Sequence, residues 1–360
     1  MDDFFARKLL HWYAEHRRIL PWRGTRDPYT IWISEIILQQ TRVSQGYSYF
    51  LRFMERFPDV EALAAADEDD VLRCWQGLGY YSRARNLHHA ARQIVGMGGF
   101  PADYERIRRL KGVGDYTAAA IASFAFGLPH AVVDGNVYRV LSRYFGIEDP
   151  IDSTAGKKHF SALAQELLPA DRAADYNQAL MDFGALQCLP RSPLCGNCPL
   201  EDSCAACLSG RVQQLPVKMK SQKVTVRYLH YIYIHVKGET AFFRREGNDI
   251  WRGLYEPFLV ETDSLCTPSE LFSADRIPGF MHGAGAVWRV LNEGLRHQLT
   301  HRQLLCNFYR LDLPEKPSDA VLGRSACWLR TGEWTSYAQP RPVEMMSEHY
   351  AESLLSTDER

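Results

Sequence analysis

The chain has 360 residues, of which 46% are hydrophobic and 24% are charged, and its formal net charge is −1. This length exceeds one ordinary hydrophobic core and predicts two domains, while the average composition excludes wholesale disorder and a fibrous repeat. The balanced charge gives no argument for nucleic-acid binding, so any such surface must be local. No apolar run reaches the ~20 residues that cross a bilayer, and the acidic, aromatic start lacks the pattern of an export signal. We therefore expect a cytoplasmic protein without membrane contact.

A single acid interrupts an almost continuous apolar run. Residues 4 to about 205 are predicted to be mostly helical, because apolar side chains recur at spacings of three and four between turn signals. Glu35 lies inside one such run, IWISEIIL at residues 31–38. A carboxyl group there loses hydration, which raises its pKa and suits it to act as a general acid near neutral pH. The alternative is a glutamate that pairs with an arginine or reaches solvent.

Basic residues gather between Arg73 and Lys111, where eight Arg or Lys accompany two acids. By itself, such a cluster is typical of a solvated helix face. The segment LKGVGDYTAAA, residues 110–120, adds a motif, because Gly112 and Gly114 permit a tight turn between two helices. Backbone amides at the start of the second helix can then bind a phosphate, which anchors DNA without reading its bases. An ordinary glycine cap at the end of the first helix is the alternative.

A second acid, Asp134, occurs in AVVDGNVYRV at residues 131–140. The Asp-Gly-Asn order indicates a turn that enters a helix, where an aspartate commonly caps the first turn. The residue types alone therefore leave Asp134 as either a helix cap or a functional carboxylate.

The nine cysteines are unevenly placed, and four of them form the spacing Cys188-x6-Cys195-x2-Cys198-x5-Cys204. Without an export signal, such a cluster indicates metal binding rather than a disulfide framework. Four thiolates that converge from one short loop suit a tetrahedral metal or a cubane cluster. Structural zinc more often uses two separated Cys-x2-Cys pairs, and this loop has one, so the spacing favours iron–sulfur. Cys207 is nearby and is expected to be a bystander.

A change in residue composition and periodicity marks a domain boundary. Residues 209–223 are polar and basic without amphipathic periodicity, and we predict a linker there. From residue 224 to 236 β-branched and aromatic residues dominate, and after a turn signal an extended pattern resumes at residues 240–244. The sequence therefore predicts a sheet-containing second domain over residues 224–345, followed by a polar tail over residues 346–360.

The cysteine spacing and the glycine turn together resemble the helix-hairpin-helix DNA glycosylases related to endonuclease III, and the ISEIILQQTR segment resembles the catalytic helix of their adenine DNA glycosylase family. The resemblance implies a mainly α N-terminal helix-hairpin-helix glycosylase domain over residues 1–208 with a 4Fe-4S cluster loop. Within it we expect a barrel module at about 20–130 and a cluster module at about 1–19 and 131–208. The cluster would shape a basic DNA-binding loop rather than transfer electrons.

The same resemblance assigns roles to three residues. Glu35, where endonuclease III relatives typically have glutamine, would protonate N7 of adenine and then help to activate water. Asp134 would stabilise or capture the positive charge that develops on the deoxyribose. Tyr116 stands where bifunctional relatives have a lysine that attacks the sugar. Because tyrosine cannot form a Schiff base, we expect a monofunctional glycosylase in which Tyr116 contacts the reacting nucleotide.

A base is cut from its sugar only after it has left the stack, so such an enzyme opens the duplex and fills the gap with side chains. In the hairpin, Lys111 occupies the position at which the family usually has proline. The resemblance places DNA contacts at Arg23 near the adenine pocket, at Gln40, Thr41, Leu78 and Tyr80 near the lesion strand, and at Lys111, Gly112, Val113 and Gly114 in the hairpin.

The second domain carries IWRGLYEPF, residues 250–258, which resembles a segment of the family's C-terminal domain. That domain shares its fold with Nudix hydrolases, so we expect an α+β Nudix-like fold. The chain lacks the acidic helix of those hydrolases, and we expect no pyrophosphatase activity. Thr300 and His301, with Leu299, stand where the family commonly has Phe-Ser-His, and they are expected to recognise oxidised guanine. Leu299 departs from the pattern.

The sequence thus predicts a monofunctional glycosylase that removes adenine opposite 8-oxoguanine or guanine. Its partner would be double-stranded DNA with such mispairs, and its cofactor would be a 4Fe-4S cluster. We expect a monomer that is located in the cytoplasm or on the nucleoid. One alternative is a bifunctional glycosylase and lyase like endonuclease III that acts on damaged pyrimidines. Another is a non-catalytic iron–sulfur module that binds DNA or senses redox state.

Overall fold

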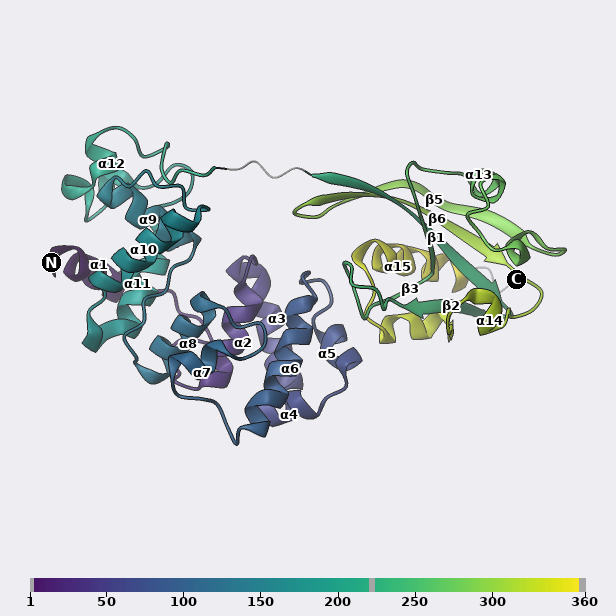
Figure 1. The fold of residues 1–360 in the computed structure, drawn as a ribbon, viewed down its shortest axis with the longest axis horizontal. Helices are drawn as coiled ribbons and strands as arrows, with labels where there is room; N and C mark the ends of the chain where they lie inside the picture. Colours follow the sequence, from purple (N-terminus) through teal and green to yellow (C-terminus); the bar gives the residue numbers. More distant parts are fainter. Residues whose placement is uncertain (1–2, 220–223, 356–360) are drawn as a thin grey trace. The chain divides into compact units, whose positions relative to one another are not determined.

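The structure is a computed structural model that describes residues 3–219 and 224–355, and it divides into two compact units (Figure 1). The helical unit comprises Met1–Ala65 and Asn86–Ser221, and the sheet unit comprises Ala66–Arg85 and Gln222–Arg360. Within the described residues, no helix is both long enough and apolar enough to cross a bilayer.

The helical unit confirms the mainly α prediction for the first part of the chain. One core joins α1, α9, α10 and α11, and Phe5, Leu141, Phe160 and Leu180 are buried in it. The helices are α1 (Asp3–His16), α2 (Pro28–Leu38), α3 (Val43–Arg56), α4 (Val60–Ala65), α6 (Ser82–Gly96, shared at its start with the other unit), α7 (Tyr104–Arg108), α8 (Asp115–Phe126), α9 (Gly135–Phe145), α10 (Thr154–Leu167), η1 (Ala170–Arg172), α11 (Ala173–Leu186), η2 (Cys195–Asn197), η3 (Glu201–Ser203) and α12 (Ala205–Leu208).

Helix α2 is buried on nearly every side and packs on α8. It begins at Pro28, whose missing amide costs nothing in the first turn, and the Asp27 carboxylate accepts hydrogen bonds from the amides of Tyr29 and Thr30. Five alanines of α8 are buried, and their small side chains allow a close approach between the helices. A polar side chain on α2 at this contact is therefore removed from water.

The sheet unit contains seven strands in the order β3-β2-β1-β6-β5, with β4 also paired to β1 and β7 to β2. Strands β1 and β6 are parallel, and the other pairs are antiparallel. The strands are β1 (Thr225–Val236), β2 (Glu239–Arg244), β3 (Tyr255–Glu256), β4 (Phe258–Thr262), β5 (Val287–Gln298), β6 (Arg302–Asp312) and β7 (Cys327–Arg330). The helices are α5 (Glu68–Cys74), α13 (Pro268–Ser273), η4 (Gly279–His282), α14 (Asp319–Leu322), η5 (Thr331–Ser336) and α15 (Arg341–Leu355).

Both faces of the sheet are covered, which explains why the consecutive residues 231–234 of β1 are all apolar and buried. Tyr231 and Tyr233 point to a core that includes Trp334 of η5 and residues of α15. Ile232 and Ile234 point to the opposite core, which includes residues of α13 and α14. Because successive side chains of a strand alternate between faces, a strand buried on both faces reads as a continuous hydrophobic run.

The end of the chain differs from the polar tail predicted from residue 346. Helix α15 continues to Leu355, and Met346 is buried in the sheet core with Val343 one turn earlier. Apolar residues at this helical spacing form a stripe that the charged residues between them conceal in the sequence. The rest of the predicted tail, residues 356–360, lies outside the described residues.

Candidate active site

A cavity of about 630 Å³ opens in the helical unit and gathers the sequence-predicted acids. Helix α2 contributes Glu35, the second residue of α8 is Tyr116, and Asp134 precedes α9. Arg23 and Thr41 also line the cavity. A concave site of this size with a few convergent polar groups has the dimensions of a pocket for one base or nucleoside.

Glu35 is 7% exposed, and its Oε2 accepts a hydrogen bond of 2.6 Å from the hydroxyl of Tyr116. Burial raises the pKa of Glu35 to about 7, against the lowering effects of the Tyr116 hydrogen bond and the positive charge of Arg23. The burial excludes a glutamate that reaches solvent, which was one alternative for this residue. A carboxyl group in this state is protonated in a large fraction of molecules at neutral pH.

Asp134 caps α9, which confirms the helix-cap interpretation, and it also lines the cavity, which leaves room for a functional role. Its Oδ1 accepts hydrogen bonds of 2.8 Å from the amides of Asn136 and Val137, and its Oδ2 accepts one of 2.8 Å from the Asn136 side chain. Burial raises the pKa of Asp134, and the hydrogen bonds from Val137 and Asn136 oppose that shift. The cap fixes the carboxylate, and the N-terminus of α9 favours its negative charge.

Asp182 on α11 is a site residue that the sequence analysis missed. Its side chain is fully buried and binds two guanidinium groups. Arg23 donates to both carboxylate oxygens at 2.5 and 2.9 Å, and Arg18 donates through Nε at 2.8 Å. The signal was present, because Asp182 is a lone acid in an apolar helical stretch, as Glu35 is. This pairing holds the Arg23 side chain against the cavity wall.

The predicted hairpin lies between α7 and α8. Gly112 has φ +77°, and a Cβ there would lie 2.6 Å from the Cβ of Asn86, so the turn requires glycine. Val113 is buried beneath the turn, whereas Lys111 and Gly114 are exposed. The first amides of α8 are therefore presented beside an exposed lysine, as an anion site at a helix N-terminus requires.

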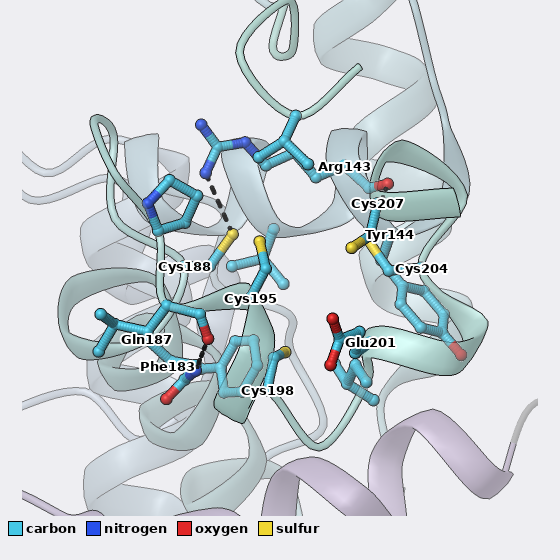
Figure 2. A pocket seen from close by; sticks show the side chains of 15 residues that line it. Arg143, Tyr144, Phe183, Gln187, Cys188, Cys195, Cys198, Glu201, Cys204 and Cys207 are labelled. Atoms are coloured by element: carbon cyan, nitrogen blue, oxygen red, sulfur yellow. Dashed lines mark hydrogen bonds between the residues drawn. The ribbon is translucent and has the colours of Figure 1, made fainter. Parts of the chain in front are cut away.

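The cysteine loop forms a separate pocket, lined by Cys188, Cys195, Cys198 and Cys204 with Cys207 (Figure 2). The sulfurs lie around the pocket. Within the described residues, no group of three His, Cys, Asp or Glu side chains is arranged to hold a single metal ion. This spread fits a multi-atom cluster that takes one thiolate at each iron.

The surroundings of the pocket also fit such a cluster. The wall is almost entirely apolar, and burial raises the pKa of Cys198 to about 12. Thiolates in this setting need compensating positive charge, which bound iron provides. Arg143 supplies a further cation, because its Nη1 lies 3.3 Å from the Cys188 sulfur (Figure 2).

A third cavity, of about 510 Å³, lies in the sheet unit and contains Tyr80, Thr300 and His301. The hydroxyls of Tyr80 and Thr300 are joined by a short hydrogen bond. Tyr80 is 43% exposed, whereas Leu78 is buried. Gln40 has φ +57° and lies just after α2, outside the residues that line the active-site cavity.

Comparison with known proteins agrees with this geometry. Residues 33–169 match the family model of the HhH-GPD superfamily base excision DNA repair proteins, and residues 188–204 match the iron-sulfur binding domain of endonuclease III. The chain is 34% identical over 310 residues to the adenine DNA glycosylase of Buchnera aphidicola subsp. Baizongia pistaciae, and the match covers 84% of each chain. It is 44% identical over 213 residues to the adenine DNA glycosylase of Mus musculus, which covers 56% of this chain and 41% of the mouse protein.

Solved structures give the same result for the helical unit. A thermostable thymine-DNA glycosylase is 33% identical with a TM-score of 0.54, and the match covers 57% of this chain and 96% of that one. An endonuclease III–DNA complex, 21% identical with a TM-score of 0.50 over 57% and 95% of the two chains, shares the fold. These matches, together with the cysteine pocket, establish that the protein is a DNA glycosylase of base excision repair that binds a 4Fe-4S cluster.

Proposed function

The chain belongs to the adenine DNA glycosylase family, and on this premise we propose that it hydrolyses the glycosidic bond of adenine paired with 8-oxoguanine or guanine. The observation that carries the proposal is the partly buried Glu35–Tyr116 hydrogen bond in a cavity that also contains Asp134. Cutting this bond requires an acid for the base and a negative charge for the sugar. The two carboxyl groups differ in surroundings in the way those two tasks require.

Glu35 is the proposed acid. Because Tyr116 donates to Oε2, Oε1 is the oxygen that carries the proton toward N7 of the flipped adenine. Protonation turns the base into a neutral leaving group, and the resulting carboxylate then orients the attacking water. Tyr116 therefore positions the acid and contacts the reacting nucleotide.

Asp134 is the proposed partner of the positive charge on the sugar. Three hydrogen bonds and the helix terminus favour its ionised form, and no displacement is needed for the carboxylate to act as the charge develops. None of the described residues that line the cavity is a lysine. This lining supports a monofunctional reaction with water, because strand cleavage through a Schiff base needs an amine.

The 4Fe-4S cluster is proposed to bind through Cys188, Cys195, Cys198 and Cys204, with Arg143 beside the first of them. When bound, the cluster supplies structural cross-linking of this loop and takes no part in the glycosidic chemistry. Cys207 lies outside the matched residues 188–204 and remains a bystander in this proposal.

DNA is proposed to bind at three places. Lys111, Gly112, Val113 and Gly114 anchor a phosphate at the start of α8, while Arg23 and Thr41 line the cavity proposed for the extruded adenine and Gln40 follows α2. Leu78 and Tyr80 belong to the sheet unit, where Tyr80 lines the cavity with Thr300 and His301. The sheet-unit cavity, with Thr300 and His301, takes the base opposite the adenine. Its hydroxyl and imidazole groups supply the donors and acceptors that distinguish an oxidised purine from an ordinary one. Action as a monomer in the cytoplasm stays a prediction.

One assay tests the proposed function. The protein is incubated with duplexes that carry adenine opposite 8-oxoguanine, guanine, cytosine or thymine, and with a thymine–guanine duplex, and abasic sites are then cleaved with alkali. We expect abasic sites in the first two duplexes, formed faster opposite 8-oxoguanine, and no strand cleavage when the alkali step is omitted.

Three results would contradict the proposal in different ways. Product from thymine–guanine alone would move the protein to the specificity of the thymine-DNA glycosylase that it matches. Covalent trapping by borohydride that depends on a lysine would replace the monofunctional mechanism with a lyase mechanism. Absence of product from every duplex would leave a module that binds DNA without cutting it.

A further inference from the structure

One carboxylate in the sheet unit binds three arginines that come from different strands and loops. Asp249, in the segment between β2 and β3, lies 2.7 Å from Arg302 through Oδ1. Its Oδ2 lies 2.7 Å from Arg227 on β1 and 3.2 Å from Arg245 at the end of β2. Burial raises the pKa of Asp249, but hydrogen bonds from Arg302 and Arg227 lower it to about 2. The group is therefore ionised at neutral pH.

Arg302 is the residue directly after the tip of the β5–β6 hairpin. This tip, residues 299–301, carries Thr300 and His301 and is here called the reading tip. The amide of Leu299 donates to the carbonyl of Arg302 at 2.8 Å, and the amide of Thr225 donates to the carbonyl of His301 at 3.1 Å. Asp249 and the reading tip line the same cavity. A side chain that fixes Arg302 therefore fixes one end of the reading tip.

The three arginines differ in what they retain if the Asp249 charge is lost. Arg227 still has Glu261, with two contacts of 2.6 Å, and Arg245 still has Glu256 at 2.6 Å. For Arg302, Asp249 is the only acidic partner among the described residues. Loss of the Asp249 charge thus releases the arginine beside the reading tip and leaves the others anchored.

We propose that Asp249 is a positioning residue that holds the reading tip and thereby sets the preference for oxidised guanine opposite adenine. This inference rests on the proposed function. The side chains of Asp249 and Arg302 are 31% and 36% exposed, so solvent screens their attraction and the ion pair adds little to folding stability. The pair instead fixes the orientation of the Arg302 side chain. A carboxylate between three fixed guanidinium groups has one arrangement that satisfies them all.

The test uses the full chain with its cluster bound and compares Asp249→Asn with Glu261→Gln. The second variant also removes an acid from Arg227, but it leaves the Asp249–Arg302 pair intact. Single-turnover excision is measured on adenine opposite 8-oxoguanine and opposite guanine. We expect Asp249→Asn to lower the ratio of the two rates by about tenfold through the 8-oxoguanine rate, and Glu261→Gln to preserve it. Asp249→Glu, which keeps the charge, should restore part of the ratio.

Three outcomes overturn the inference. An unchanged ratio in Asp249→Asn removes the positioning role, and an equal fall of both rates assigns Asp249 to folding, which thermal melting would reveal as a lower melting temperature. An equal loss of the ratio in Glu261→Gln assigns the effect to the general charge of the sheet unit. Failure of the proposed function is distinct, since it is seen in the wild-type protein, which would then release no adenine or show no preference between the two partners.

Discussion

The cavity in the helical unit and the cavity in the sheet unit are built on opposite physical principles. Around Glu35 the side chains are buried, and removal of water shifts the pKa of an acid into the working range. Around Thr300 the groups are exposed, and an arginine–carboxylate network centred on Asp249 lines the same cavity. Under the proposed function, the chemistry depends on removal of water, whereas recognition depends on the orientation of side chains. Substitutions should accordingly cost orders of magnitude in the first cavity and small factors in the second.

The largest expected effect is the replacement of Glu35 by glutamine. The amide fills the same volume and can still accept a hydrogen bond from Tyr116, but it cannot deliver a proton. We expect the single-turnover rate on adenine opposite 8-oxoguanine to fall on the order of 10³-fold, with duplex affinity close to that of the wild type. Rapid-quench kinetics and a binding titration measure the two quantities.

The control for this variant is Glu61→Gln, which removes an exposed acid from α4 in the same helical unit. It should leave the excision rate unchanged. If Glu35→Gln retains near wild-type excision, Glu35 is not the acid, and the buried carboxyl group must be explained by packing instead.

The second effect is on pH dependence. Because the proposed role of Glu35 requires its protonated form and burial raises its pKa to about 7, the excision rate should fall by about tenfold per pH unit above that value. The same pKa shift affects the stability of the fold, because the folded state holds this proton more tightly than the unfolded chain does. The resulting stabilisation is present below the ordinary pKa of a glutamate and is lost as pH rises through about 7.

The measurement is a series of single-turnover rates from about pH 6 to about pH 9 and of melting temperatures from about pH 4 to about pH 9. Glu35→Gln should lack this stability loss, so it should melt above the wild type at the alkaline end. A flat rate profile in the wild type would mean that another group supplies the proton.

Many of the candidate site residues in the helical unit could be predicted from the sequence because they depart from local patterns. Glu35 interrupts an apolar helix, Gly112 and Gly114 break a helical pair, and Cys188 begins a metal-ligand spacing. Each anomaly is visible within about a dozen residues, the range over which helical periodicity is defined. The helical fold was predictable for the same reason, since most of its contacts follow from amphipathic helices with short connections.

The rest depends on contacts between residues far apart in the chain. Asp182 binds Arg23 across 159 positions, and Asp249 binds Arg302 across 53. An acid that will meet an arginine only after folding has the same local appearance as a surface acid, unless its own neighbours are apolar. Asp182 had such neighbours and was missed, whereas Asp249 lies in a polar loop and offered no signal. The burial of Met346 was hidden similarly, because the sheet that covers it is distant in sequence.

The smallest expected effect is Tyr80→Phe, which probes orientation alone. Tyr80 has φ +50°, and its hydroxyl hydrogen bonds to Thr300, so the tyrosine hydroxyl helps to aim the reading tip. Loss of one such bond costs about 1 kcal/mol, which corresponds to roughly fivefold in the preference for 8-oxoguanine over guanine. Tyr337→Phe removes a hydroxyl from the same unit but outside the residues that line this cavity, and it should leave the preference unchanged. Should Tyr80→Phe instead slow both substrates by the hundredfold or more expected of the catalytic cavity, Tyr80 would belong to base extrusion and the division between dehydration and orientation would fail.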